Sequence, residues 1–183
     1  MKYDIIYADP PWEYSGRIKS TNKRGFTHVS DHYPTMSGKE IMALAPTIKD
    51  ISKENCLLFM WTTSPYMAYS IDVMKEWGFD YKAVAFVWEK ERVNMGAYTM
   101  GSCEFVIVGK KGKIPKKSVH NIRQFLSEKR TEHSKKPLEI QKRIDTMFPS
   151  ASKIELFARN SADGWDSWGN EINGIDIFNG ASK

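Results

Sequence analysis

Short apolar runs alternate along this chain with segments in which apolar residues recur at helical spacing, and this alternation restricts the possible folds more than any other feature. The five apolar runs, each typical of a buried strand, are residues 3–8, 57–63, 81–88, 103–111 and 153–159. The three segments with helical spacing are residues 35–46, 66–79 and 137–148. A mainly parallel sheet with helices on both faces satisfies this order. We therefore predict a doubly wound α/β fold.

Local signals mark where some of these elements begin and end. Ser37 and Glu40 have the spacing of a capping box, which predicts the start of the first helix. Gly78 predicts the end of the second helix, and Pro137 suits the first turn of the third. No helical segment separates the third and fourth apolar runs, so we expect these two strands to form an antiparallel pair at an edge of the sheet.

The length of 183 residues is sufficient for one domain with a buried core, which we expect to span residues 1–183. Cys56 and Cys103 lie in separate apolar runs and are predicted to be buried thiols. No apolar stretch is long enough to span a membrane, and residues 1–15 lack the layout of a signal peptide, so a cytoplasmic location is expected. No pair of histidines has metal-ligand spacing with other ligands, and no metal is predicted.

Lysine and arginine total 27 against 22 aspartates and glutamates, which gives a formal net charge of +5. Much of the excess lies in basic runs between the apolar segments, at residues 17–24, 110–117, 128–130 and 134–136. Loops at one end of a sheet could present these runs together to a phosphate backbone. The alternative is solvated loop charge that keeps the protein soluble, and composition alone does not separate the two.

The first predicted strand runs directly into the motif DPPW, which is Asp9, Pro10, Pro11 and Trp12. Two consecutive prolines fix the backbone, supply no N–H donors and leave carbonyl oxygens that only accept hydrogen bonds. In a doubly wound sheet, ligands lie beyond the carboxyl ends of the strands, and the DPPW motif falls at such an end. The motif therefore predicts an acceptor site in a ligand cleft.

A planar amine that donates two hydrogen bonds fits this acceptor site. The exocyclic amine of adenine would donate to the Asp9 carboxylate and the Pro10 carbonyl, which favours a pyramidal nitrogen with its lone pair toward an electrophile. Trp12 or Tyr14 could stack on the base, which must leave its helix or already be single-stranded. The alternative is that Asp9 caps a turn and Trp12 packs in the core.

The motif ADPPW resembles the signature of the adenine-N(6) methyltransferases that use S-adenosylmethionine, a family that includes messenger-RNA adenosine methyltransferases and many bacterial and phage enzymes. Further blocks resemble that family in its own order: HYPTMSGKEI, LLFMWTT, FVWEKE, EFVIVGKKG, EHSKKP, KIELFAR and WDSWGNEI. The resemblance implies a Rossmann-like class I methyltransferase fold in permuted order, with the catalytic strand first. The chain departs from Rossmann proteins in lacking GxGxxG, and ELFARN stands in its place.

The resemblance also implies roles for particular residues. The catalytic positions around the amine are Asp9, Pro10, Pro11 and Trp12. The positions implied to bind the cofactor S-adenosyl-L-methionine are Asp9, Lys136, Glu155, Leu156, Arg159, Asn160, Asn170 and Glu171. The substrate-binding candidates over the site or on its acceptor side are Tyr14, Tyr33, Trp88, Lys90 and Glu104. From the basic loops at 13–32 and 89–102 we expect contacts to the nucleic-acid strand through Arg17, Lys19, Lys23, Arg24 and Arg92.

Ordinary structural explanations exist for several of these positions. Lys136 could be a solvated loop charge, Tyr33 a core aromatic and Asn170 a turn residue. Glu155 is harder to explain in this way, because an unpaired carboxylate in an apolar strand is costly and a ribose diol would satisfy it.

The predicted function is methyl transfer from S-adenosyl-L-methionine to adenine-N(6) in nucleic acid. DNA is favoured over RNA, because a compact chain of this size is similar to the prokaryotic and phage members. One alternative is a non-catalytic nucleic-acid-binding subunit that partners an active methyltransferase, although such a subunit has no need of an intact DPPW motif. Another is methylation of a small molecule or a protein amide. A homodimer or a partner subunit is expected, without membrane association.

Overall fold

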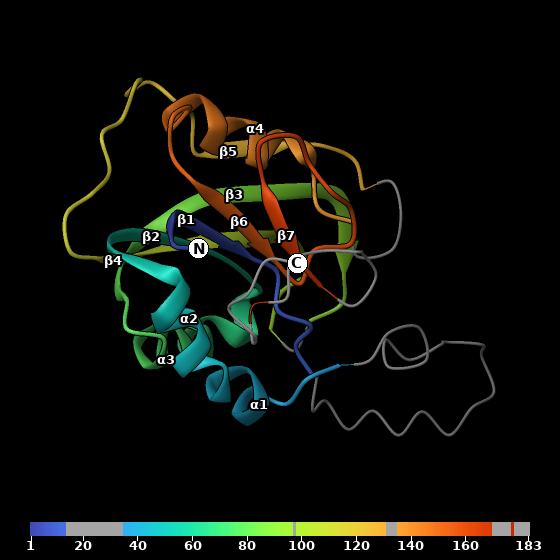
Figure 1. Cartoon of the computed structure of the whole chain (residues 1–183). Helices are drawn as coiled ribbons and strands as arrows, with labels where there is room; N and C mark the ends of the chain where they lie inside the picture. The colour runs from blue at the N-terminus through green and yellow to red at the C-terminus, as the bar shows by residue number, and fades with distance from the viewer. Residues whose placement is uncertain (14–34, 97, 131–134, 170–176, 178–183) are drawn as a thin grey trace.

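A seven-stranded sheet forms the middle layer of the described part of the chain (Figure 1). The computed structural model describes residues 1–13, 35–96, 98–130, 135–169 and 177. The strands are β1 (Tyr3–Ala8), β2 (Ser52–Thr62), β3 (Asp80–Asn94), β4 (Gly101–Lys111), β5 (Phe125–Ser127), β6 (Lys153–Leu156) and β7 (Asp166–Trp168). Their order is β5-β3-β4-β2-β1-β6-β7. β4 is antiparallel to β2 and β3, and the other neighbouring strands pair in parallel, which confirms the predicted α/β fold.

The antiparallel pairing of β3 with β4 is confirmed, but its predicted place at the edge of the sheet is wrong. β4 lies between β3 and β2, and the three-residue strand β5 continues the sheet beyond β3. β5 and the equally short β7 lie in segments without strand periodicity, so the sequence pattern did not reveal them. The loop expected at 89–102 is also shorter, because β3 continues to Asn94 and β4 begins at Gly101.

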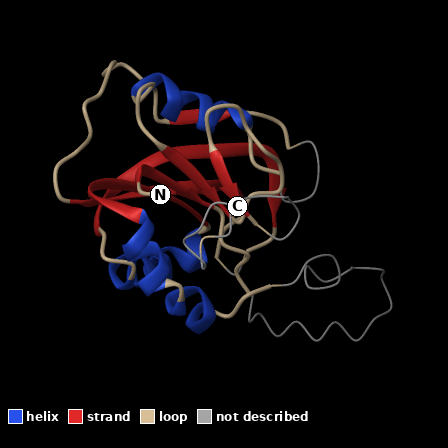
Figure 2. Cartoon of the chain, viewed as in Figure 1, coloured by secondary structure: helices blue, strands red, loops and turns tan. Residues whose placement is uncertain are grey.

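Helices cover both faces of the sheet, as Figure 2 shows. The helices on one face are α1 (Gly38–Ala43), α2 (Ala45–Ile51) and α3 (Met67–Glu76), and the helix on the other face is α4 (Leu138–Met147). A short 3-10 turn, η2 (Ser64–Tyr66), precedes α3. The single helix predicted at 35–46 is two helices that meet at Leu44, and the second of them extends further than predicted.

The predicted helix boundaries have the expected chemistry. The Ser37 hydroxyl accepts from the backbone N–H of Glu40, and the Glu40 carboxylate accepts from the N–H of Ser37, so the capping box at α1 is confirmed. Gly78 follows α3 with a φ of 88°, a left-handed conformation that suits glycine. Trp77, fully buried beside it, donates its indole N–H to the Ile41 carbonyl at 2.9 Å and so ties α3 to α1.

Successive residues of the central strands point to opposite faces of the sheet, and both faces are buried. Ile6 and Leu58 pack with the apolar residues of α1, α2 and α3. Ile5 and Leu57 pack with Ile144 of α4 on the other face. These two cores fix the central strands, and with them the chain segments that follow each strand.

Parallel pairing places the carboxyl ends of β1, β2 and β6 side by side, along the edge of the sheet where these strands end. Asp9 follows β1, and Thr63 follows β2. Phe157 follows β6 with a φ of 61°, so the chain leaves the sheet there through a left-handed residue. The DPPW segment, which the sequence placed at the ligand end of a strand, therefore meets there the segments that follow β2 and β6.

The basic run at 110–117 begins at the opposite edge of the sheet. Lys111 is paired with Cys56 near the start of β2, because β4 runs against β2. The prediction that the basic runs gather at one end is therefore wrong for this run. Cys56 is fully buried as predicted, whereas Cys103 is only half-buried. Among the described residues, no helix has the length and apolar character needed to cross a membrane.

Candidate active site

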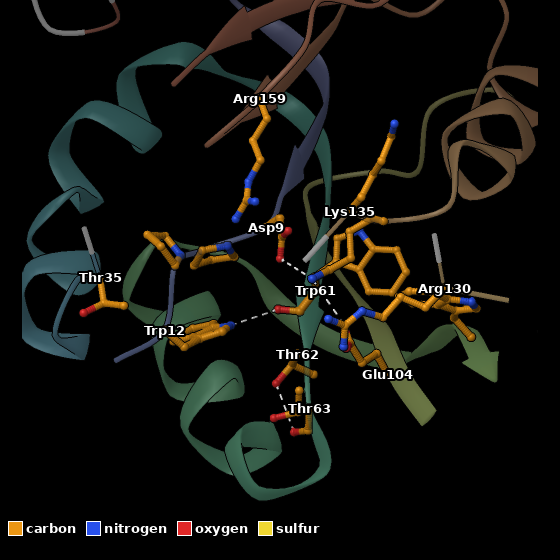
Figure 3. Close-up of a pocket in the computed structure, with 14 residues that line it drawn as sticks. Asp9, Trp12, Thr35, Trp61, Thr62, Thr63, Glu104, Arg130, Lys135 and Arg159 are labelled. Carbon is orange, nitrogen blue, oxygen red and sulfur yellow. Dashed lines mark hydrogen bonds and ion pairs between the residues drawn. The ribbon is translucent and has the colours of Figure 1, made fainter. Parts of the chain in front are cut away.

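A pocket lies at the carboxyl edge of β1 and β2 (Figure 3). Its walls come from the segment after β1, the end of β2, the strands β3 and β4, and the segments before α4 and after β6. The lining residues are Asp9, Pro10, Pro11, Trp12, Thr35, Trp61, Thr62, Thr63, Trp88, Glu104, Arg130, Lys135, Lys136 and Arg159. The DPPW motif therefore contributes four consecutive residues to one pocket.

Asp9 places a carboxylate in this pocket. It is the first residue after β1, and its backbone N–H donates to the Leu156 carbonyl of β6 at 3.4 Å, which fixes where the DPPW segment begins. Its Oδ1 lies 3.1 Å from Nζ of Lys136, and 22% of the side chain is exposed. Burial raises the pKa of Asp9, and the Lys136 ammonium opposes that rise.

Lys136 is shared between two carboxylates. Its Nζ lies 3.1 Å from Oδ1 of Asp9 and 3.2 Å from Oε2 of Glu104. The same ammonium lies 5.3 Å from the centre of the Trp61 ring, a cation–π distance. Burial alone would lower the pKa of Lys136, but the charges of Asp9 and Glu104 raise it above its usual value. Lys136 is therefore a permanent cation in this site.

Glu104 extends the ion pairs to Lys90. Its Oε1 accepts from Nζ of Lys90 at 3.1 Å, and the two side chains are 17% and 9% exposed. Burial alone would raise the pKa of Glu104, but the ammonium groups of Lys136 and Lys90 bring it below its usual value. Charges of alternating sign thus run from β3 to the end of β1. We call this set the charge chain: Lys90, Glu104, Lys136 and Asp9.

The backbone of the DPPW segment is held by its own hydrogen bonds. The Pro10 carbonyl accepts from the N–H of Trp12 at 2.8 Å, and the Pro11 carbonyl accepts from the N–H of Met36 at 2.9 Å. A carbonyl oxygen has two lone pairs, so each can still accept from a ligand. The segment is therefore both fixed in place and able to accept.

Trp12 is a largely buried residue, with 5% of its surface exposed. Its indole N–H donates to the Trp61 carbonyl at 3.3 Å, and its ring lies against those of Tyr66 and Tyr69. Most of Trp12 packs in the core, which is the alternative that the sequence left open, and the remainder forms one wall of the pocket. Stacking of Trp12 on a base therefore stays a prediction, which would involve only the part of the ring that lines the pocket.

The Glu155 side chain contacts α4, and Glu155 is not among the residues that line the pocket. Its Oε2 accepts from Nε2 of Gln141 at 3.0 Å, so the prediction that this carboxylate lacks a protein partner is wrong. Burial, with a smaller contribution from the charge of Asp9, raises the pKa of Glu155 to about 7. Glu155 is therefore a carboxyl group that changes its charge near neutral pH.

The remaining described candidates lie in different surroundings. Trp88 and Arg159 line the pocket, as predicted for residues near the site. Leu156 is fully buried in the core, and Asn160 is exposed and does not line the pocket. Arg92 is exposed near the end of β3. Eight further candidates lie outside the described residues, and their roles stay predictions: Tyr14, Arg17, Lys19, Lys23, Arg24, Tyr33, Asn170 and Glu171.

Several residues that line the pocket or contact its residues were not among the site residues predicted from the sequence. Trp61, Thr62 and Thr63 end a predicted strand at the ligand edge, so their position alone could have identified them. Gln141 gave a weaker signal, as a polar residue on the buried side of a helix. Arg130 and Lys135 also line the pocket and lie in the basic runs at 128–130 and 134–136, whereas Thr35 carried no recognisable pattern. Within the described ranges, no group of three or more histidine, cysteine, aspartate or glutamate side chains is arranged to hold a metal ion.

The mostly parallel sheet, helices on both faces and an acceptor pocket after β1 define a Rossmann-like methyltransferase. The family model of MT-A70 matches residues 3–171. The chain belongs to the MT-A70 family, which confirms the resemblance found in the sequence.

Named relatives agree with this family. The chain is 48% identical to the type II methyltransferase M.MunI of a Mycoplasma species, over 96% of this chain and 81% of that protein. It is 30% identical to an MT-A70-like N(6)-adenosine-methyltransferase of Arabidopsis thaliana, over 97% of this chain and 25% of that protein. It is 27% identical to the human N(6)-adenine-specific methyltransferase METTL4, over 93% of this chain and 37% of that protein. The chain thus spans most of the Mycoplasma relative and a minor part of the two eukaryotic ones.

Proposed function

We propose that this chain is an adenine-N(6) methyltransferase that transfers a methyl group from S-adenosyl-L-methionine to the exocyclic amine of adenine in DNA. The observation that carries the proposal is the Asp9 carboxylate, which lines the pocket with the Pro10 carbonyl and is paired with Lys136. Membership of the MT-A70 family and a type II methyltransferase relative matched over 96% of the chain support the same reaction.

The acceptor amine is the difficult partner in this reaction. The lone pair of the adenine nitrogen is delocalised into the ring, so the amine is a poor nucleophile while it stays planar. Asp9 and the second lone pair of the Pro10 carbonyl accept its two hydrogens. The nitrogen lone pair then points away from both acceptors, and the acceptors stabilise the positive charge that develops on nitrogen during attack.

Asp9 accepts a hydrogen bond from the amine most strongly while it is ionised. Burial raises its pKa, and Lys136 at 3.1 Å favours the charged form. As the new nitrogen–carbon bond forms, the bond between the methyl group and the sulfonium sulfur breaks; the nitrogen then carries a positive charge, and one of its two hydrogens is lost as a proton to Asp9 or to water. A carboxyl group whose pKa is raised by burial takes this proton more readily than an exposed aspartate does.

The donor and acceptor groups of the site fit S-adenosyl-L-methionine. The amino-acid part of this cofactor carries a carboxylate and an ammonium group, and the pocket offers the cations of Lys136 and Arg159 beside the Asp9 carboxylate. Glu155, near enough to Asp9 for their charges to interact, would accept from the ribose hydroxyls. When bound, the cofactor supplies an electrophilic methyl group on a sulfonium. Further cofactor contacts are proposed for Leu156, Asn160, Asn170 and Glu171.

We favour DNA as the polymer, with the protein acting in the cytoplasm as a homodimer or with a partner subunit. A target adenine in a duplex must leave its base stack to place its amine at Asp9. The strand contacts proposed for the segment at 13–32 and for Arg92 would neutralise phosphates, so binding should weaken steeply with added salt. A complex insensitive to salt would contradict these phosphate contacts.

The proposed reaction is tested with labelled S-adenosyl-L-methionine and random-sequence DNA and RNA in single- and double-stranded form. The wild-type protein should label adenine-N(6) in DNA, and Asp9→Ala should lower the rate by roughly 10²- to 10³-fold or more, as for loss of one transition-state hydrogen-bonding group. Asp50→Ala, which removes an exposed carboxylate on α2, is the matched control and should retain activity. Undiminished activity of Asp9→Ala would refute the mechanism.

Calorimetry separates this enzyme from a non-catalytic nucleic-acid-binding subunit. The proposed methyltransferase binds S-adenosylhomocysteine in the absence of DNA. A protein that binds DNA but neither binds S-adenosylhomocysteine nor labels adenine would be the non-catalytic subunit.

A further inference from the structure

Lys90 differs from the other three members of the charge chain, because it does not line the pocket. Its residue surface is 7% exposed, and its Nζ lies 3.1 Å from Oε1 of Glu104. A buried ammonium group is costly unless it is paired, and one carboxylate partner repays that cost only when the geometry is good. A lysine in this position therefore needs an explanation beyond packing.

We propose that Lys90 is a positioning residue of the active site, which holds Glu104 so that Glu104 in turn holds the Lys136 ammonium against the Asp9 carboxylate. The sequence predicted Lys90 as a substrate-binding residue, and the structure has it behind Glu104 instead. The effect of Lys90 on methylation rests on the proposed function. Its effect on the titration of Asp9 rests on the charge chain alone.

The two carboxylate oxygens of Glu104 pair with different lysines. Oε1 accepts from Lys90 and Oε2 lies 3.2 Å from Lys136, so each lysine has its own oxygen. Lys90 is on β3 and Glu104 is on β4, where Glu104 pairs with Trp88, two residues before Lys90, so the two side chains are neighbours on paired strands just before the register shifts. The sheet therefore fixes both the Lys90 ammonium and the carboxylate it contacts. Lys136 lies in the segment before α4, and the fixed Glu104 carboxylate determines where its ammonium is held.

The positive and negative charges of the charge chain also balance one another. The charge chain contains two ammonium groups and two carboxylates, so its net charge is zero when all four are ionised. Without the Lys90 cation, Lys136 has to neutralise Glu104 and Asp9 alone, and one of these carboxyl groups then gains a proton more readily. The other charged groups that act on the pocket are Glu155 and Arg159, which affect Asp9, and the lining residues Arg130 and Lys135. They stay in place in all the variants below.

Carboxyl titration of the ligand-free protein tests the electrostatic part. Carbon-13 labels in the aspartate and glutamate carboxyl groups report the titration of Asp9 by NMR, assigned with Asp9→Asn. Lys90→Met should move the Asp9 midpoint upward by roughly half a pH unit, less than the effect of a directly adjacent charge, because Lys90 acts on Asp9 through Glu104 and Lys136. Lys90→Arg keeps the cation and should move it much less. The double variant Lys90→Met with Glu104→Gln should return the midpoint to the wild-type value or below, since Lys136 then pairs with Asp9 alone.

The same variants are compared in the methylation assay through the pH dependence of kcat/KM. The acidic limb should move upward in Lys90→Met and return in the double variant, even where Glu104→Gln lowers the rate itself. Lys53→Met is the matched control, because it breaks a lysine–carboxylate pair with Asp4 (2.7 Å) at the opposite edge of the sheet. That variant should leave both the Asp9 midpoint and the acidic limb unchanged.

Each result for the Asp9 midpoint either supports or contradicts the positioning role of Lys90. An unchanged Asp9 midpoint in folded Lys90→Met, or a double variant that fails to restore it, would overturn the positioning role and leave Lys90 as a packing residue. If Lys90→Met does not fold, Lys90→Gln, which also removes the cation, takes its place, and an unchanged Asp9 midpoint there also overturns the inference. A wild-type protein that labels no adenine would count against the proposed function, while the NMR result would still stand or fall by itself.

Discussion

Replacing Glu155 by glutamine should make the ligand-free protein more stable above neutral pH, because the ionised carboxylate is unfavourable in its surroundings. Glu155 lies on β6, accepts one hydrogen bond from Gln141 at 3.0 Å, and is otherwise held in a largely buried position. Burial and the charge of Asp9 raise its pKa from an ordinary 4.5 to about 7. Glutamine has the same shape and can still accept from Gln141 through its amide oxygen, but it does not ionise.

The sign of the pH effect follows from proton binding. Between about pH 4.5 and 7 the folded protein holds a proton on Glu155 that the unfolded chain has lost, so the free energy of unfolding falls as the pH rises. The difference between the two pKa values, at about 1.4 kcal/mol per unit, amounts to roughly 3 kcal/mol once the pH exceeds 7. The glutamine variant does not incur this loss. Its advantage over the wild type should therefore grow by up to about 3 kcal/mol from pH 4.5 to pH 8.

Urea unfolding of both proteins at half-unit intervals from pH 4.5 to 8 measures this difference directly. The gap between the two free energies of unfolding should open from about pH 4.5 to pH 7 and then level off. Gln141→Met provides a second check, because loss of the amide donor should raise the Glu155 pKa further, so that the wild-type-like loss of stability continues to a higher pH before it levels off. A gap that stays constant across the pH range would refute the reasoning. If Glu155 also holds the cofactor ribose, the more stable variant should bind S-adenosylhomocysteine more weakly, a trade of stability against function.

Two further substitutions test the packing that supports the site. Gly109→Ala should lower the free energy of unfolding by about 1–3 kcal/mol, because a Cβ on this β4 residue would collide with the side chain of Met74, and the same substitution should cost less in a Met74→Ala background. Wild-type stability in Gly109→Ala would show that α3 moves aside freely. Trp12→Phe should cost about 1–3 kcal/mol in urea unfolding, because it leaves the buried Trp61 carbonyl without its indole donor. No loss there would mean that Trp12 is not fixed by the core.

The place of the site could be predicted from the sequence, because it depends on short-range patterns. Apolar runs of strand length and helical spacing define parallel strands, and the carboxyl ends of such strands share an edge. Asp9 was therefore located correctly by its position after a strand, and the same reasoning could have identified Trp61, Thr62 and Thr63. The capping box at Ser37 is equally local, and it is present in the structure.

What the sequence could not provide is which charged residues pair with one another. Lys90 and Glu104 come together because β3 and β4 are adjacent and antiparallel, and Lys136 joins them from a distant segment before α4. Nothing in the local pattern around Lys136 separates a solvated loop lysine from one held by two carboxylates. Gln141 illustrates the same difficulty, since its partner Glu155 is on β6, a separate element, and only the packing of α4 on the sheet brings them together.

The arrangement at Asp9 also suggests how a buried carboxylate can be kept ready for an amine. An N–H donor, the Lys136 ammonium, lies against Oδ1 of Asp9 and favours the charged form of the carboxylate that the proposed reaction needs. A carboxylate has two oxygens with several lone pairs, so an adenine amine can be accepted without displacing this cation. A neutral residue in place of Lys136 would leave two buried carboxylates near each other, and such a pair retains a proton. Lys136 therefore keeps Asp9 ionised as a hydrogen-bond acceptor, and the Asp9 carboxylate in turn holds the Lys136 ammonium in place.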